Sequence, residues 1–105
     1  MMVDAELTNR VIELAIEIQQ IPAPTFEERE RAEFVRAKFL EAGLSNVEMD
    51  ATGNVYGRWR GGDSSPLVVS AHLDTVFPRE TNLLVKREAK RIYGPGIGDN
   101  SIGVA

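Results

Sequence analysis

Cysteine is absent from the 105 residues of this chain, and histidine occurs only once, as His72. Disulfide bonds and thiolate metal sites are therefore excluded, and any metal ion would be held by His, Asp or Glu side chains. The chain also lacks a long apolar run, and its N-terminus carries acidic residues where a signal peptide would carry basic ones. We expect a cytoplasmic protein without a membrane partner.

An excess of basic residues is missing as well, since the formal net charge is -4. Nucleic-acid binding needs a clustered basic surface, so we expect no nucleic-acid partner. The hydrophobic fraction of 43% and the charged fraction of 27% are typical of a globular protein. A length of 105 residues allows one core and not two.

Two segments carry apolar side chains at intervals of three and four residues, the spacing of one helix face. The first covers residues 7–21 and ends at the prolines of IPAP, because proline disfavours helical geometry in the residue before it. The second is predicted to begin near Phe26. Gly43 followed by Leu44 predicts that it ends in a Schellman motif.

The start of this second helix carries the sequence TFEE, which fits a capping box. In that motif the hydroxyl of Thr25 would accept a hydrogen bond from the amide of Glu28. The carboxylate of Glu28 would accept one in return from the amide of Thr25.

After Gly43 the apolar period falls to two, which predicts strands around residues 47–49 and 55–59 with the turn DATGN between them. The run LVVSA is apolar without alternation, as in a strand covered on both faces, so we place a central strand at Leu67 to Ala71. A further short hairpin is predicted within residues 82–94. The order of elements predicts an α/β fold, a partial three-layer sandwich with helices packed on a mixed β-sheet.

The sequence SAHLDTVFP places His72 directly after the predicted central strand. Alternation would put His72 and Asp74 on one face, where the Asp74 carboxylate could accept a hydrogen bond from one ring nitrogen and leave the other for a metal. A lone histidine beside an apolar run is more often a core residue. This tripeptide alone leaves both interpretations open.

The sequence GPGIGDN places Asp99 after three glycines and before a possible helix. One interpretation is a turn whose aspartate caps the helix. A dinucleotide-binding loop is a second, but Asp99 stands where that loop has its third glycine and would repel a pyrophosphate. No lysine follows the glycines, which excludes a P-loop.

Together, SAHLDTVFP and RIYGPGIGDNSIGVA resemble the first two motifs of the co-catalytic di-zinc peptidases and deacylases. This family includes aminoacylase, acetylornithine deacetylase, succinyl-diaminopimelate desuccinylase, glutamate carboxypeptidase and tripeptidase. The resemblance implies that His72 is a zinc ligand, that Asp74 orients it as a catalytic residue, and that Asp99 bridges two zinc ions. It further implies a cis peptide bond between Asp99 and Asn100. Many relatives carry lysine where this chain has Ser101, which leaves the subfamily open.

The resemblance implies hydrolysis of amide bonds in short peptides or N-acyl amino acids by a metal-activated water, with zinc, cobalt or manganese as the metal. The family's general base and its remaining zinc ligands come later in the sequence, and SIGVA ends in mid-pattern. We therefore expect residues 1–105 to be the N-terminal portion of the catalytic domain, inactive alone and without the lid or dimerisation domain. An open sheet edge would favour homo-oligomers. The alternatives are a non-catalytic binding or assembly module and a nucleotide-binding α/β domain.

Overall fold

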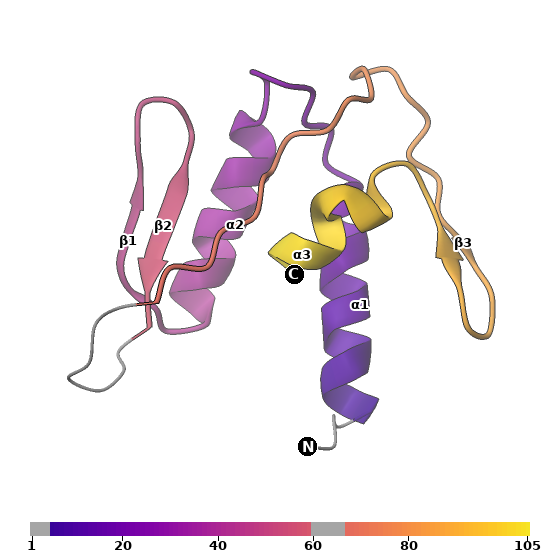
Figure 1. The fold of residues 1–105 in the computed structure, drawn as a ribbon, viewed down its shortest axis with the longest axis horizontal. Helices are drawn as coiled ribbons and strands as arrows, with labels where there is room; N and C mark the ends of the chain where they lie inside the picture. Colours follow the sequence, from indigo (N-terminus) through magenta and orange to yellow (C-terminus); the bar gives the residue numbers. More distant parts are fainter. Residues whose placement is uncertain (1–4, 60–66) are drawn as a thin grey trace.

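A computed structural model describes residues 5–59 and 67–105 of the chain (Figure 1). Two helices are followed along the sequence by two antiparallel hairpins and a short helical segment, and the α/β class is confirmed. The elements in chain order are α1 (Ala5–Gln19), α2 (Arg29–Glu41), β1 (Ser45–Met49), β2 (Val55–Arg58), β3 (Lys86–Arg87), β4 (Ile92–Tyr93), the wide turn η1 (Ile97–Ser101) and α3 (Ile102–Val104).

The helix α2 ends as its sequence predicts. The amide of Leu44 donates to the carbonyl of Phe39 at 3.1 Å, and the amide of Gly43 donates to the carbonyl of Leu40 at 3.1 Å. These are the two hydrogen bonds of a Schellman motif, and Gly43 supplies its left-handed residue with φ of 80°. The chain can therefore reverse at once into β1.

The hairpins pair as expected, β1 with β2 and β3 with β4, both antiparallel. Met49 faces Val55 across the first turn, and the register shifts between Ser45 and Glu48. Within the described ranges, each sheet has two strands, so the predicted mixed sheet is wrong. The hairpin β1–β2 lies beside α2, and β3–β4 lies on the far side of α1 (Figure 1).

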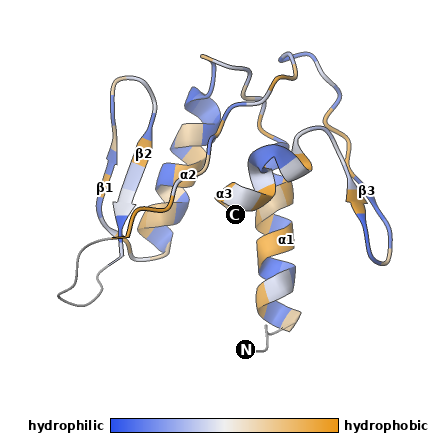
Figure 2. Cartoon of the chain, viewed as in Figure 1, coloured by the Kyte–Doolittle hydropathy of each residue, from blue (hydrophilic) through white to orange (hydrophobic). Residues whose placement is uncertain are grey.

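The predicted central strand at Leu67 to Ala71 is not formed. These residues form a connecting segment that pairs with no strand in the described part of the chain, although their apolar character is evident in Figure 2. Leu67, Val68 and Val69 are 88%, 84% and 86% exposed. β-propensity alone does not make a strand, because its backbone groups need a neighbouring strand to bond.

The start of α2 also differs from the prediction. Phe26 adopts a left-handed φ of 71°, and the helix begins three residues later at Arg29. The Glu28 carboxylate accepts a hydrogen bond from the amide of Phe26 at 2.9 Å, not from that of Thr25. The capping box is therefore wrong, and the hydroxyl of Thr25 has a different partner, described below.

The apolar core is small and lies where the two long helices approach the connection between them. Its buried members are Ala15, Ile18, Ala23, Ala32 and Val35. Polar side chains are buried with them, namely Gln19, Arg31, Thr75 and Ser101. Among the described residues, no helix is long and apolar enough to span a membrane.

Candidate metal centre

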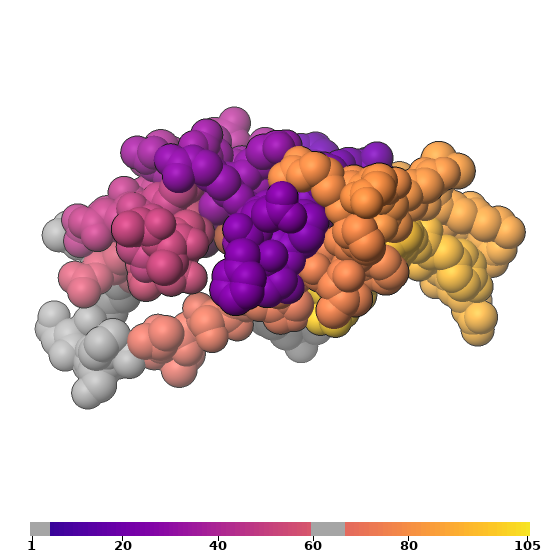
Figure 3. Space-filling view, turned by 90° about the horizontal axis from the view of Figure 1, so that it is seen from above, coloured from indigo at the N-terminus to yellow at the C-terminus, as the bar shows by residue number. Residues whose placement is uncertain are grey.

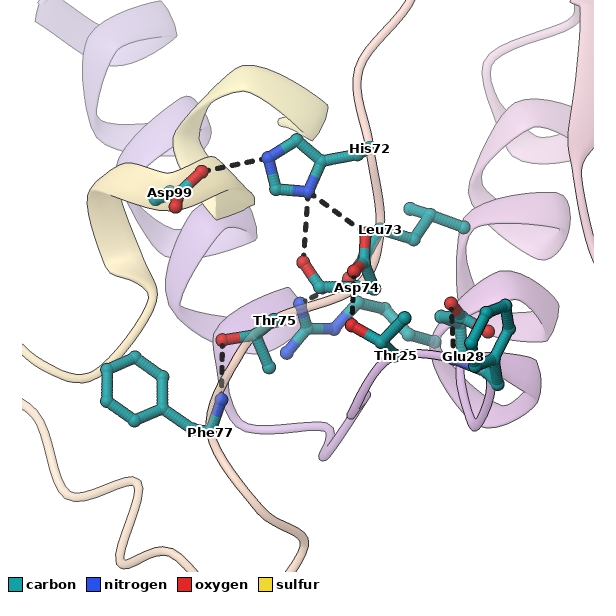
Figure 4. A network of polar contacts seen from close by, with 10 residues as sticks. Thr25, Glu28, His72, Leu73, Asp74, Thr75, Phe77 and Asp99 are labelled. Atoms are coloured by element: carbon teal, nitrogen blue, oxygen red, sulfur yellow. Dashed lines mark hydrogen bonds and ion pairs between the residues drawn. The ribbon is translucent and has the colours of Figure 1, made fainter.

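The structure brings His72, Asp74 and Asp99 together (Figure 4). The Nε2 atom of His72 lies 2.8 Å from Oδ1 of Asp99, although the two residues are 27 positions apart. The Nδ1 atom of His72 lies 3.0 Å from the carbonyl oxygen of Asp74 and 3.3 Å from its Oδ1 atom. Each ring nitrogen therefore faces oxygen acceptors, one set from Asp74 and the other from Asp99.

The glycine-rich loop determines how Asp99 reaches the histidine. Gly96 has a left-handed φ of 76°, and a Cβ atom there would lie 3.4 Å from the Thr75 hydroxyl. Asp99 and Asn100 leave helical geometry inside η1, and the peptide bond between them is cis, as the resemblance implies. Asp99 thus precedes α3 and points its carboxylate across to the segment that carries His72 (Figure 4).

Arg31 fixes the backbone on the histidine side of the site. Its guanidinium is buried, at 3% exposure, and its Nη1 atom donates to the carbonyl of Leu73 at 2.7 Å. Its Nε and Nη2 atoms donate to the carbonyl of Ile21 at 3.1 and 2.6 Å. One side chain of α2 therefore joins the end of α1 to the residue between His72 and Asp74.

Three further contacts join the connection between α1 and α2 to the segment that follows His72. The amide of Thr75 donates to the carbonyl of Ala23 at 2.8 Å, and Pro24 and Thr75 form a parallel bridge. Figure 3 shows the connection between α1 and α2 lying against the segment that follows His72. The hydroxyl of Thr25 donates to Oδ2 of Asp74 at 2.6 Å.

Gln19 fixes the other half of the site. This side chain is fully buried, and its Nε2 atom donates to the carbonyls of Leu83 and Pro95 at 3.0 Å each. Pro95 lies in the glycine-rich loop, so the end of α1 holds the backbone that leads to Asp99. Gln19 of α1 thus supports the segment of Asp99, as Arg31 of α2 supports the segment of His72.

The ionisation of the site follows from these contacts. The hydrogen bond to Asp99 raises the pKa of His72, and the backbone contact to Asp74 acts in the same direction. The hydrogen bond from Thr25 lowers the pKa of Asp74, helped by the nearby imidazole. Burial lowers the pKa of the Arg31 guanidinium, while Asp74 opposes that shift.

The donor set suits zinc in part. Zinc binds imidazole nitrogen and carboxylate oxygen at about 2.0 to 2.2 Å, which in tetrahedral geometry places two ligand atoms about 3.3 Å apart. The separation of 2.8 Å between His72 and Asp99 is within a small side-chain adjustment of that value, and both side chains are open, at 50% and 82% exposure. The described residues contain no group of three or more His, Cys, Asp or Glu side chains that could hold a metal.

Comparison with known proteins finds one similarity to a family model. Residues 54–105 match the model of Peptidase family M28. The match supports a zinc-type peptidase. It covers His72, Asp74 and Asp99 together, whereas α1, α2 and β1 lie outside the matched range. A search of curated proteins finds no match to the chain.

Sequence reasoning missed the residues that support this site. The motif FEERERAEF, with its alternating glutamates and arginines, suggests surface ion pairs, and Arg29 does pair with Glu33 at 3.5 Å. Arg31, in the same motif, is buried instead. Nothing in the local pattern distinguishes Arg31 from Arg29, because the acceptor at Leu73 lies 42 residues away.

Proposed function

We propose that residues 1–105 are the N-terminal portion of the catalytic domain of a zinc-dependent hydrolase. The proposed reaction is hydrolysis of an amide bond in a short peptide or an N-acyl amino acid by a metal-activated water. The observation that carries the proposal is the 2.8 Å approach of His72 Nε2 to Asp99 Oδ1. The match of residues 54–105 to Peptidase family M28 supports it.

In this proposal His72 and Asp99 would be zinc ligands, and the Asp99 carboxylate would serve both ions of the complete site. A bound zinc would lower the pKa of its water ligand to about 7 and would polarise the scissile carbonyl. Asp74 serves as the partner of Nδ1 of His72, which keeps the tautomer in which Nε2 is free to coordinate. Cobalt or manganese are alternative metals for the same ligands.

The rest of the proposed machinery lies outside residues 1–105. A catalytic zinc takes about three protein ligands and a water, and His72 and Asp99 supply two of them. We place the remaining ligands, a glutamate general base and a lid domain in a longer protein. The cytoplasm is the proposed compartment, and deacylase or exopeptidase specificity is part of the proposal.

Calorimetric titration of the chain with zinc tests the proposal. We expect weak binding, with Kd above about 1 μM, because the site has fewer than the usual three ligands. His72→Ala and Asp99→Asn should each weaken binding at least about 10-fold, since each removes half of the ligand set. Glu88→Gln, on the remote β3–β4 hairpin, is the control and should change nothing.

The possible outcomes separate the candidate functions. Equal zinc affinity in the wild type and both ligand variants would contradict the proposal and favour a non-catalytic binding or assembly module. Tight binding of two zinc ions would contradict the inference that later ligands are needed. A rise in unfolding midpoint with NAD or ATP, and none with zinc, would favour the nucleotide-binding alternative, because a ligand of the folded state stabilises it.

A further inference from the structure

We propose that Thr25 is a positioning residue of this site: its hydroxyl fixes the carboxylate of Asp74 and, through Asp74, the imidazole ring of His72. The connection between α1 and α2 would then contribute directly to the geometry of the metal ligand. The role toward zinc rests on the proposed function, but the role toward the imidazole ring does not.

The two carboxylate oxygens of Asp74 have different partners. The Oδ2 atom accepts the hydrogen bond from Thr25 Oγ1 at 2.6 Å, and the Oδ1 atom lies 3.3 Å from Nδ1 of His72, which also lies 3.0 Å from the Asp74 backbone carbonyl. A distance of 2.6 Å is typical of a hydroxyl bound to an ionised carboxylate, about twice as strong as a neutral hydrogen bond. Rotation of the carboxylate would break one contact in order to improve the other. Thr25 therefore sets the orientation in which Oδ1 faces the ring (Figure 4).

The backbone holds Thr25 in register with Asp74. The hydrogen bond from Thr75 to Ala23 and the bridge between Pro24 and Thr75 align the two segments immediately beside the Thr25–Asp74 contact. On the other side, Arg31 binds the carbonyl of Leu73. The hydroxyl therefore starts from a fixed position, and its hydrogen bond can transmit that position to the side chain of Asp74.

The hydroxyl is free for this role because the helix does not use it. The helix α2 begins at Arg29, and the side chain of its N-cap residue, Glu28, makes no capping hydrogen bond. The Thr25 side chain is also exposed, so replacement by valine requires no repacking of the core. Loss of the hydroxyl should therefore act on Asp74 and His72 without unfolding the chain.

The experiment compares the wild type with Thr25→Val, which removes the hydroxyl, and Thr25→Ser, which keeps it. Thr52→Val is the matched control, because the Thr52 hydroxyl also donates to an aspartate carboxylate, that of Asp50, at 2.8 Å in the remote β1–β2 turn. One readout is zinc affinity by calorimetry. The other is NMR relaxation of the imidazole ring without metal, which is unambiguous because His72 is the only histidine.

Thr25→Val should weaken zinc binding about 10-fold, the lower limit for losing a partner that supports a metal ligand, and should increase the amplitude of ring motion. Thr25→Ser should restore both values to within about 2-fold of the wild type, and Thr52→Val should leave both unchanged. Circular dichroism checks folding, and Thr25→Ala replaces the valine variant if that variant unfolds.

Unchanged ring motion in Thr25→Val would overturn the proposal, and so would failure of Thr25→Ser to restore it. If the wild type binds no zinc, the proposed function fails, while the ring motion still decides whether Thr25 positions the histidine. If zinc binds and His72→Ala weakens it but Thr25→Val does not, the proposed function stands and the role of Thr25 is wrong.

Discussion

Replacement of Arg31 by methionine should destabilise the chain more than any change to a surface arginine. The Arg31 guanidinium is 3% exposed and donates three hydrogen bonds to two backbone carbonyls, those of Ile21 and Leu73. Methionine has a similar length and no donor, so it fills most of the space and leaves both carbonyls without this partner. The variant therefore isolates the hydrogen bonds from the packing.

The size of the effect follows from those two acceptors. A buried acceptor that loses its partner costs about 1 to 3 kcal/mol, which gives about 2 to 6 kcal/mol for two. Ile21 and Leu73 are only half-buried, so water can reach their carbonyls in part. Removal of the guanidinium also relieves the cost of burying a charge. We therefore expect a loss of about 2 to 4 kcal/mol, a large share of the stability of a domain of this size.

Urea unfolding followed by circular dichroism measures this loss, and Arg29→Met is its control on the same helix. The Arg29 side chain is 80% exposed and pairs with Glu33 at 3.5 Å, so its replacement should cost less than about 0.5 kcal/mol. Arg31→Lys should lie between the two, because an ammonium keeps the charge but lacks the planar fork. A loss below about 1 kcal/mol in Arg31→Met would refute the reasoning.

Three further predictions concern other parts of the molecule. Hydrogen bonds from Asn54 and Thr52 hold the pKa of Asp50 in the folded chain well below its value in the unfolded chain. The ionised Asp50 therefore stabilises the folded state at neutral pH, and this contribution is lost as the pH falls below about 4 toward the folded pKa. Unfolding free energies should therefore fall more steeply below about pH 4 in the wild type than in Asp50→Asn; parallel curves would contradict this. Gly43→Ala should lower the free energy of unfolding by about 1 kcal/mol, because φ at this residue is 80°. Gly98→Ala should be nearly neutral, because Gly98 lies outside that region of φ and has equal space for a Cβ atom. Equal losses in the two variants would contradict the role of φ. The chain should self-associate through the exposed apolar residues 67–69. In sedimentation experiments Val68→Lys should lower the apparent mass, whereas the control Val76→Lys, at a site 85% exposed, should not. A wild type that stays monomeric at high concentration would contradict this prediction.

The parts of the fold that depend on contacts between residues close together in the sequence could be predicted from it. The period of apolar residues gave α1 to within about two residues, and Gly43 with Leu44 gave the end of α2 with its hydrogen bonds. The turn DATGN gave the β1–β2 hairpin, where the Asp50 carboxylate accepts hydrogen bonds from the amides of Thr52 and Asn54. In each of these cases the interacting groups lie within about five residues of one another.

The parts that depend on distant residues could not be predicted in this way. The strand expected at 67–71 has the right composition, but strand formation requires a partner elsewhere in the chain, and the described residues provide none. Thr25 has the sequence of a helix cap, yet its hydroxyl binds Asp74, which is 49 residues away. A hydrogen bond from a hydroxyl to an ionised carboxylate is about twice as strong as one between neutral groups, which favours the tertiary contact of Thr25.

The candidate site depends both on local sequence motifs and on contacts between residues far apart in the sequence. The resemblance of the two motifs predicts that His72 and Asp99 are ligands, but their approach to 2.8 Å requires two backbone segments to be held at fixed positions. Gln19 and Arg31 provide those positions from one region, where α1 ends and α2 begins. These helices lie outside the part of the chain that matches Peptidase family M28, although they support the residues inside it. The geometry of the matched segment therefore depends on the fold of the unmatched one, and substitutions of Gln19 or Arg31 should change the site as much as substitutions beside His72.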